Sequence, residues 1–105
     1  GEGEIANKKV KGRVTVSYSL KDPVRHALKM PVPAYMCQGG GEVVVNIEVN
    51  RNGDVLSAKI DESLSEPNSC LKEAALSKAS LSVFNADPSA PARQRGTITS
   101  LFISQ

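Results

Sequence analysis

The sequence has 105 residues, which suits one small domain with one modest hydrophobic core. Aromatic residues make up only 4% of the chain, so the core is expected to be aliphatic. The net charge of +2 comes from 13 basic and 11 acidic residues spread along the sequence, without the dense basic patch that nucleic-acid binding requires, and no nucleic-acid partner is expected.

The first expected element is a strand. Residues 1–12 are predicted to be a flexible start, and we expect the natural chain to begin further upstream, with an export signal or membrane anchor. Residues 13–20, RVTVSYSL, alternate apolar and polar side chains with the period of two that is typical of a strand. Residues 23–38 contain three prolines, which rule out a regular strand, so they are predicted to form an irregular arm with at most a short helix after Pro23.

The clearest pattern in the chain is a β-hairpin over residues 42–61. Its two alternating runs are joined by Asn50-Arg51-Asn52-Gly53, and both Asn and Gly tolerate the positive φ that tight turns need. The first run is expected to share an apolar face made of Val43, Val45, Ile47 and Val49. The return strand is expected to place Leu56, Ala58 and Ile60 on one face.

After the hairpin the period changes to that of a helix. Residues 69–84 are rich in Ala, Leu, Lys and Glu and are predicted to be helical, with Asn68 or Ser69 as the N-cap. A stripe of small apolar side chains would let this helix pack closely on a sheet. The stripe is Leu71, Ala75 and Ala79. Residues 96–104, GTITSLFIS, are predicted to be the last strand.

This order of elements predicts an α+β fold over residues 13–105. We expect a small two-layer domain with a mainly antiparallel sheet of three or four strands and one principal helix. A helix between the second hairpin strand and the last strand is a crossover, so these two strands should be parallel, with the first hairpin strand between them. The last strand of this split β-α-β unit then lies at or near a sheet edge.

Groups that could carry chemistry are sparse, and we expect neither an enzyme nor a metal or cofactor site. His26 is the only histidine, and no nucleophile or orienting carboxylate follows it at a recognisable spacing. Asp61, Glu62 and Glu66 are typical of a solvated turn, although a glycosidase-like pair or a weak cation site would use the same residues. Gly39–Gly41 precede a strand rather than a helix, so they do not form a phosphate loop.

The two cysteines, Cys37 and Cys70, do not form a Cys-x-x-Cys pair. Three alternatives remain open from the residues alone: a disulfide, two unrelated buried thiols, or one reactive thiol.

Several pieces of the chain form a recognisable series. They are Pro31-x-Pro33-x-Tyr35 in the arm, GGEVVVNIEVNRNGDVLSAKI in the hairpin, LKEAAL in the helix, Phe84 followed by Asp87-Pro88, and GTITSLF at the end. From about residue 30 onward the chain therefore resembles the C-terminal domain of the TonB energy-transducer family, in the form common among Bacteroidetes-type envelope proteins. The arm departs from the family, which usually has Tyr followed by Pro, and residues 13–20 lie outside the usual module.

The resemblance implies a periplasmic domain that is joined to an inner-membrane anchor in the full-length protein. Such a domain binds an outer-membrane TonB-dependent transporter and passes on energy from the proton gradient. In the family, a transporter peptide adds to the last strand as a further strand, and this strand has no Lys, Pro or Asp that would blunt an edge. The partner-binding residues expected here are Thr97, Ile98, Thr99, Ser100, Leu101, Phe102 and Ile103.

The implied periplasmic location also favours a disulfide between Cys37 and Cys70, since the return strand of the hairpin should bring the helix start back toward the arm. The segment Met30–Tyr35 of the arm is expected to lie against the fold, because its prolines make it stiff. A flexible tether is the alternative for this segment.

A different function follows if residues 13–20 pair with the last strand. That pairing would occupy the docking edge, and the domain would then be a non-transducing envelope module for protein binding or assembly. A homodimer is a further option, and a small secreted inhibitor is a third reading of the same layout.

Overall fold

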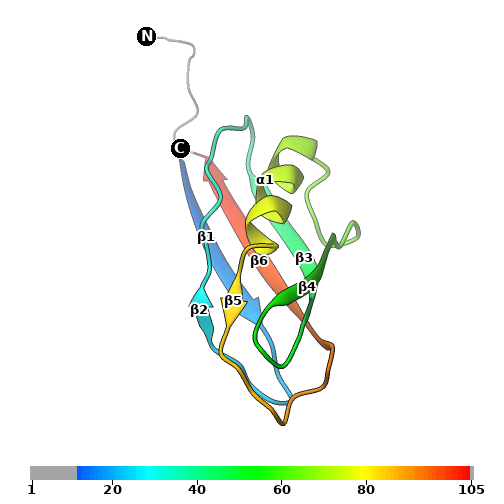
Figure 1. Ribbon diagram of the computed structural model, residues 1–105. Helices are drawn as coiled ribbons and strands as arrows, with labels where there is room; N and C mark the ends of the chain where they lie inside the picture. Colours follow the sequence, from blue (N-terminus) through cyan, green and yellow to red (C-terminus); the bar gives the residue numbers. More distant parts are fainter. Residues whose placement is uncertain (1–11, 105) are drawn as a thin grey trace.

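The computed structural model describes residues 12–104, in which four strands form one antiparallel sheet in the order β1-β6-β3-β4 (Figure 1). These strands are β1 (Gly12–Ser19), β3 (Gly41–Val49), β4 (Val55–Ile60) and β6 (Gln94–Ser104). A second, two-stranded sheet pairs β2 (Ala27–Lys29) with β5 (Val83–Phe84), and the helix is α1 (Ser69–Ala79). The predicted α+β fold is confirmed, whereas residues 1–11 of the expected flexible start lie outside the described residues.

The position of β3 confirms the predicted crossover. Strand β3 is antiparallel to both β4 and β6, so β4 and β6 run parallel to each other on either side of it. The connection from β4 to β6 contains helix α1 and strand β5, and α1 packs on one face of the sheet. This is the split β-α-β arrangement expected from the order of elements.

The last strand lies near the edge of the sheet, as expected, but it is not the edge strand itself. Strand β1 pairs with β6 from Gly12, which lies opposite Ser104, to Ser19, which lies opposite Thr97. The pairing places Val14 and Val16 beside the core and satisfies backbone groups of β6 that would otherwise be free. The alternative in which residues 13–20 cover the last strand is the one found.

The hairpin turn lies where it was predicted. The N–H of Gly53 donates a 3.0 Å hydrogen bond to the carbonyl of Asn50, and Gly53 has a φ of 97°, which favours glycine. The expected facing of Leu56 is wrong, because its side chain is 44% exposed. A register shift between Glu48 and Val49 places Val55 rather than Leu56 opposite the buried Val49.

Helix α1 begins as predicted but ends earlier than expected. The Asn68 side chain caps it by accepting hydrogen bonds from the N–H groups of Cys70 and Leu71, at 3.0 and 3.2 Å. The predicted buried stripe of Leu71, Ala75 and Ala79 is confirmed.

The predicted helical end at residues 83–84 is instead strand β5. The N–H of Phe84 donates to the carbonyl of Gly53, and its ring packs edge-on against Tyr18 with 5.3 Å between centroids. These contacts with distant segments outweigh the local helical pattern.

The arm runs beside α1 over the same face of the sheet (Figure 1). It is extended, and alternate residues turn inward, among them Arg25, Pro33 and Cys37. The short helix considered after Pro23 does not form, because the chain enters β2 there. Met30 and Tyr35 pack against the core, which confirms that this segment lies against the fold.

The two faces of the main sheet therefore differ. One face, covered by α1 and the arm, carries the core. The other, which we call the open face, carries mainly small polar and charged side chains. Its members include Thr15 and Ser17 on β1, Thr97 and Arg95 on β6, Asn46 and Glu48 on β3, and Ser57 and Lys59 on β4.

Candidate functional site

The groups considered for chemistry do not converge on a site. His26 is exposed, and its backbone exchanges hydrogen bonds with Asn85. The hydroxyl of Ser63 donates to Asp61 and lowers the pKa of that carboxyl, and Glu62 pairs with Lys72. Within residues 12–104, no group of three or more His, Cys, Asp or Glu side chains could hold a metal ion. The expectation that the chain is not an enzyme stays a prediction.

The described helix α1 is neither long enough nor apolar enough to cross a membrane.

The residues predicted to bind a partner, Thr97 to Ile103, lie inside the sheet. Ile98, Ser100 and Phe102 are buried on the core face, and the intervening residues lie on the open face. Their backbones face β1 on one side and β3 on the other. In this arrangement β6 has no free edge to which a strand could be added, so partner binding at these residues stays a prediction and would require β1 to leave the sheet.

The outer edge of β1 has the properties that were expected of β6. Within the described part of the chain, no backbone hydrogen bond reaches β1 on the side away from β6. Every second residue of an edge strand directs its N–H and C=O outward, so half of these groups of β1 are available. The strand contains no proline, and Arg13 is its only charged residue. Such an edge can accept a further strand.

The opposite edge of the sheet, β4, is less suited to this role. It has 6 residues against 8 in β1, it carries Lys59, and its pairing with β3 is interrupted by the register shift near Val55. Short length, a lysine and a bulge are the features that blunt an edge against pairing. The two free edges of the sheet are therefore unequal.

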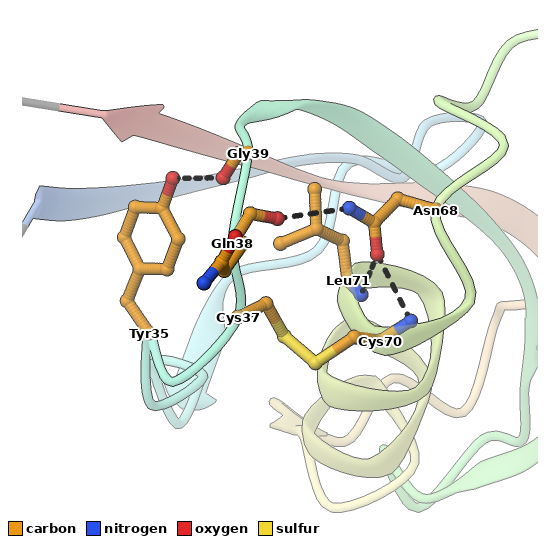
Figure 2. Close-up of a disulfide and its surroundings, with 7 residues drawn as sticks. All are labelled: Tyr35, Cys37, Gln38, Gly39, Asn68, Cys70 and Leu71. Carbon is orange, nitrogen blue, oxygen red and sulfur yellow. Dashed lines mark hydrogen bonds between the residues drawn. A yellow bond between two sulfur atoms is a disulfide. The ribbon is translucent and has the colours of Figure 1, made fainter. Parts of the chain in front are cut away.

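The disulfide between Cys37 and Cys70 is confirmed, and it fixes the arm to the start of α1 (Figure 2). The two Cα atoms are 5.8 Å apart. Asn68 reinforces this link, because the side chain that caps α1 also donates a 3.0 Å hydrogen bond to the carbonyl of Gln38. The arm is thus tied to α1 both covalently and by hydrogen bonds, which holds it over the core face next to β1 and β6.

Tyr35 fixes the same part of the arm to the sheet. Its hydroxyl donates to the carbonyl of Gly39 and lies 2.9 Å from the hydroxyl of Ser104 (Figure 2 shows the first of these bonds). Its ring meets Phe102 edge-on, with 5.4 Å between centroids. The arm therefore reaches the end of β6 through one aromatic side chain.

A buried arginine was missed by the sequence analysis. Arg25 is fully buried, and its guanidinium donates to the carbonyls of Asn85 and Asn50 and to the side chain of Gln94. Arginine is rarely buried in this way, and only the alternation of the arm residues could have indicated it. Because protein acceptors occupy its donors, Arg25 holds the fold together and does not offer a binding site.

Over residues 12–104 the protein is thus a small α+β domain whose main sheet ends in two edge strands, of which β1 is better suited than β4 to accept a further strand. Comparison with protein-family models, with curated proteins and with solved structures finds no match for it. The resemblance to the TonB family therefore stays a prediction.

Proposed function

We propose that this chain is a non-catalytic protein-binding domain of the cell envelope, which takes up an extended segment of a partner along the outer edge of β1. The observation that carries the proposal is the unpaired backbone edge of a strand of 8 residues without proline or lysine. The pairing of β1 with β6 is the reason why a binding or assembly module is preferred over an energy transducer.

The side chains of β1 suit an added strand that is amphipathic. Val14 and Val16 are half-buried on the core face, while Thr15 and Ser17 are exposed on the open face. Each backbone hydrogen bond to a partner contributes only about 1 kcal/mol net. Selectivity would therefore come from apolar partner residues beside the two valines and polar residues on the other face.

The disulfide supports a periplasmic location for this binding domain. Cys37 and Cys70 form an intrachain bond, and such bonds persist in oxidising compartments such as the periplasm. A partner in the same compartment, an outer-membrane transporter among them, is consistent with this placement.

Amide hydrogen exchange tests the proposal directly. In the free protein, alternate amides of β1 should exchange fast because they face solvent, while those bonded to β6 are protected. Addition of extended peptides from transporter plug regions should protect the fast β1 amides and leave those of β4 unchanged. Protection that instead appears without peptide and rises with protein concentration would identify a second copy of the chain as the partner. No change in β1 with any peptide would refute the proposal.

Energy transduction is the second candidate, and one observation favours it. Strand β1 joins the main sheet through β6 alone, and it lies outside the part of the chain that resembles the TonB family. If β1 left the sheet, residues Thr97 to Ile103 would become an edge, and a transporter peptide could take its place.

A second disulfide separates the two candidates. Ser17 and Thr99 lie directly opposite each other, so a Ser17→Cys/Thr99→Cys variant should link β1 to β6 on the open face. Binding at the outer edge of β1 would survive this link, whereas binding that requires β1 to leave would be lost. Mass spectrometry of peptide fragments would verify that the link between Cys37 and Cys70 remains correctly paired.

A further inference from the structure

The open face is hollowed where β3, β4 and β6 lie side by side. The hollow has a volume of about 610 Å³ and lies away from the outer edge of β1. We call it the polar hollow. The side chains that line it on the open face are Asn46, Glu48, Ser57, Lys59, Arg93 and Arg95.

The strand register arranges these side chains in rows across the sheet. Arg95 on β6 lies directly opposite Glu48 on β3, which lies opposite Ser57 on β4. In the next row, Asn46 lies opposite Lys59. Directly opposite residues of antiparallel strands have Cβ atoms about 5 Å apart, so each row forms a continuous polar surface.

Positive charge exceeds negative charge in the polar hollow. Lys59, Arg93 and Arg95 line it together with one carboxylate, that of Glu48, which leaves a net charge of +2. Arg93 donates to a single oxygen of Glu48, at 2.8 and 2.9 Å. Among the described residues, no carboxylate lies within salt-bridge distance of Arg95 or Lys59.

The salt bridge neutralises the hollow only in part. The Arg93 side chain is 60% exposed and that of Glu48 is 28% exposed, so water screens their attraction. Two cations therefore remain on either side of Glu48. The hydroxyl of Ser57 lies between them, together with the amide of Asn46, which donates a 3.4 Å hydrogen bond to Asp61. These groups can bind to carboxylates and to peptide backbone.

We propose that the polar hollow binds an acidic, extended segment of a partner protein. Arg95 and Lys59 are two strands and two residues apart, which places their Cα atoms about 12 Å from each other. A single small anion would meet one of these cations. Carboxylates four residues apart in an extended peptide are about 13 Å apart, so one peptide reaches both. The proposal uses other strands than the outer edge of β1, and either can fail without the other.

Chemical-shift titration at low ionic strength tests the proposal. The probe is a ten-residue peptide of alternating Glu and Thr, with a matched peptide of alternating Gln and Thr and inorganic phosphate as comparisons. The Glu peptide should shift the amides of Asn46, Glu48, Lys59 and Arg95, and these shifts should fade as salt is added. Equal shifts with the Gln peptide or with phosphate, or no shifts with the Glu peptide, would overturn the proposal.

Charge variants test the site residue by residue. Lys59→Gln/Arg95→Gln should weaken binding of the Glu peptide about tenfold, since it removes two exposed ionic contacts. Glu48→Gln should strengthen binding about threefold, because it removes the carboxylate that competes with the ligand for Arg93 and Arg95.

The matched control removes two lysines from elements on the core-face side of the molecule, one on β2 and one on α1. Lys29→Gln/Lys78→Gln changes the net charge equally and should alter binding less than twofold. An equal loss in this control would show a general charge effect, and weaker binding in Glu48→Gln would show that the rows do not form the site. Thermal unfolding of each variant confirms that the fold is retained.

Discussion

The guanidinium of Arg25 donates a 2.9 Å hydrogen bond to the side-chain oxygen of Gln94, and both residues are buried although 69 positions separate them. Gln94 in turn donates 2.7 Å hydrogen bonds to the carbonyls of Lys21 and Pro23. These bonds join the corner between β1 and the arm to the start of β6. The corner that positions the β1 edge therefore depends on two buried polar side chains.

Replacement of Arg25 should destabilise the protein strongly. Arg25→Met keeps most of the side-chain volume but leaves Gln94 and the carbonyls of Asn50 and Asn85 without their donor. Unsatisfied buried groups of this kind lower the free energy of unfolding by about 3 kcal/mol in total. Urea denaturation measures the loss, with the exposed Lys21→Gln as a control for the lost charge. Equal stability of the two variants would contradict a structural role for Arg25.

Loss of the disulfide should lower stability and release the arm. The bond closes a chain separation of 33 residues, for which the chain-entropy model gives about 3–4 kcal/mol. Cys37→Ala/Cys70→Ala should lose about this amount in urea denaturation and should show faster amide exchange near Tyr35. Wild-type protein measured with and without reductant serves as the control. Unchanged exchange in the arm would show that its noncovalent contacts suffice.

The Tyr35 hydroxyl should contribute modestly and locally. Tyr35→Phe keeps the edge-on contact with Phe102 but removes the hydrogen bonds with Gly39 and Ser104. We expect a loss of about 1 kcal/mol in the free energy of unfolding. Amide exchange should accelerate around Gly39 and at the end of β6, while β4 keeps its protection. Uniform acceleration over the whole sheet would argue against a local role.

Two aspartates should make stability fall in acid. The Ser89 hydroxyl and N–H donate to Asp87 and, with the charge of Arg25, lower the pKa of that carboxyl, while Ser63 lowers the pKa of Asp61. A lowered folded-state pKa stabilises the protein above the ordinary value of 3.8, and this contribution is lost as pH falls through the folded-state pKa.

The measurement is the thermal unfolding midpoint from about pH 6 to about pH 2. The decline below about pH 4 should be shallower in Asp61→Asn/Asp87→Asn than in the wild type. An identical pH profile for the two proteins would show that other carboxyl groups cause the decline.

The parts of the fold that the sequence predicted are those whose pattern is local. The hairpin turn at Gly53 and the cap at Asn68 each depend on a few neighbouring residues, and both are found where expected. The end of α1 was misjudged because Phe84 is held by Gly53 and Tyr18, which are far away in the sequence. Leu56 was misplaced because alternation does not reveal a bulge.

The position of the free sheet edge also depends on contacts between distant parts of the chain. Both β1 and β6 alternate and are rich in β-branched residues, so either strand could form the outer edge of the sheet. The choice depends on β1 meeting β6 from the other end of the described chain, which no local pattern encodes. The sequence therefore predicted a docking edge on β6, whereas the edge strand of the sheet is β1. The charged rows of the polar hollow likewise depend on a register that appears only when the strands pair.

The pairing of Gly12 with Ser104 also determines how this domain would respond to mechanical force. A pull applied through these two residues acts across the strands, so β1 would separate from β6 one residue pair at a time, in an unzipping geometry that yields at low force. The disulfide would prevent the force from extending the residues between Cys37 and Cys70, because it closes them into a ring. About 110 Å of chain would therefore not extend, and the β3–β4 hairpin lies within this ring. A domain loaded in this way would release β1 first, while the hairpin and its link to α1 stayed connected.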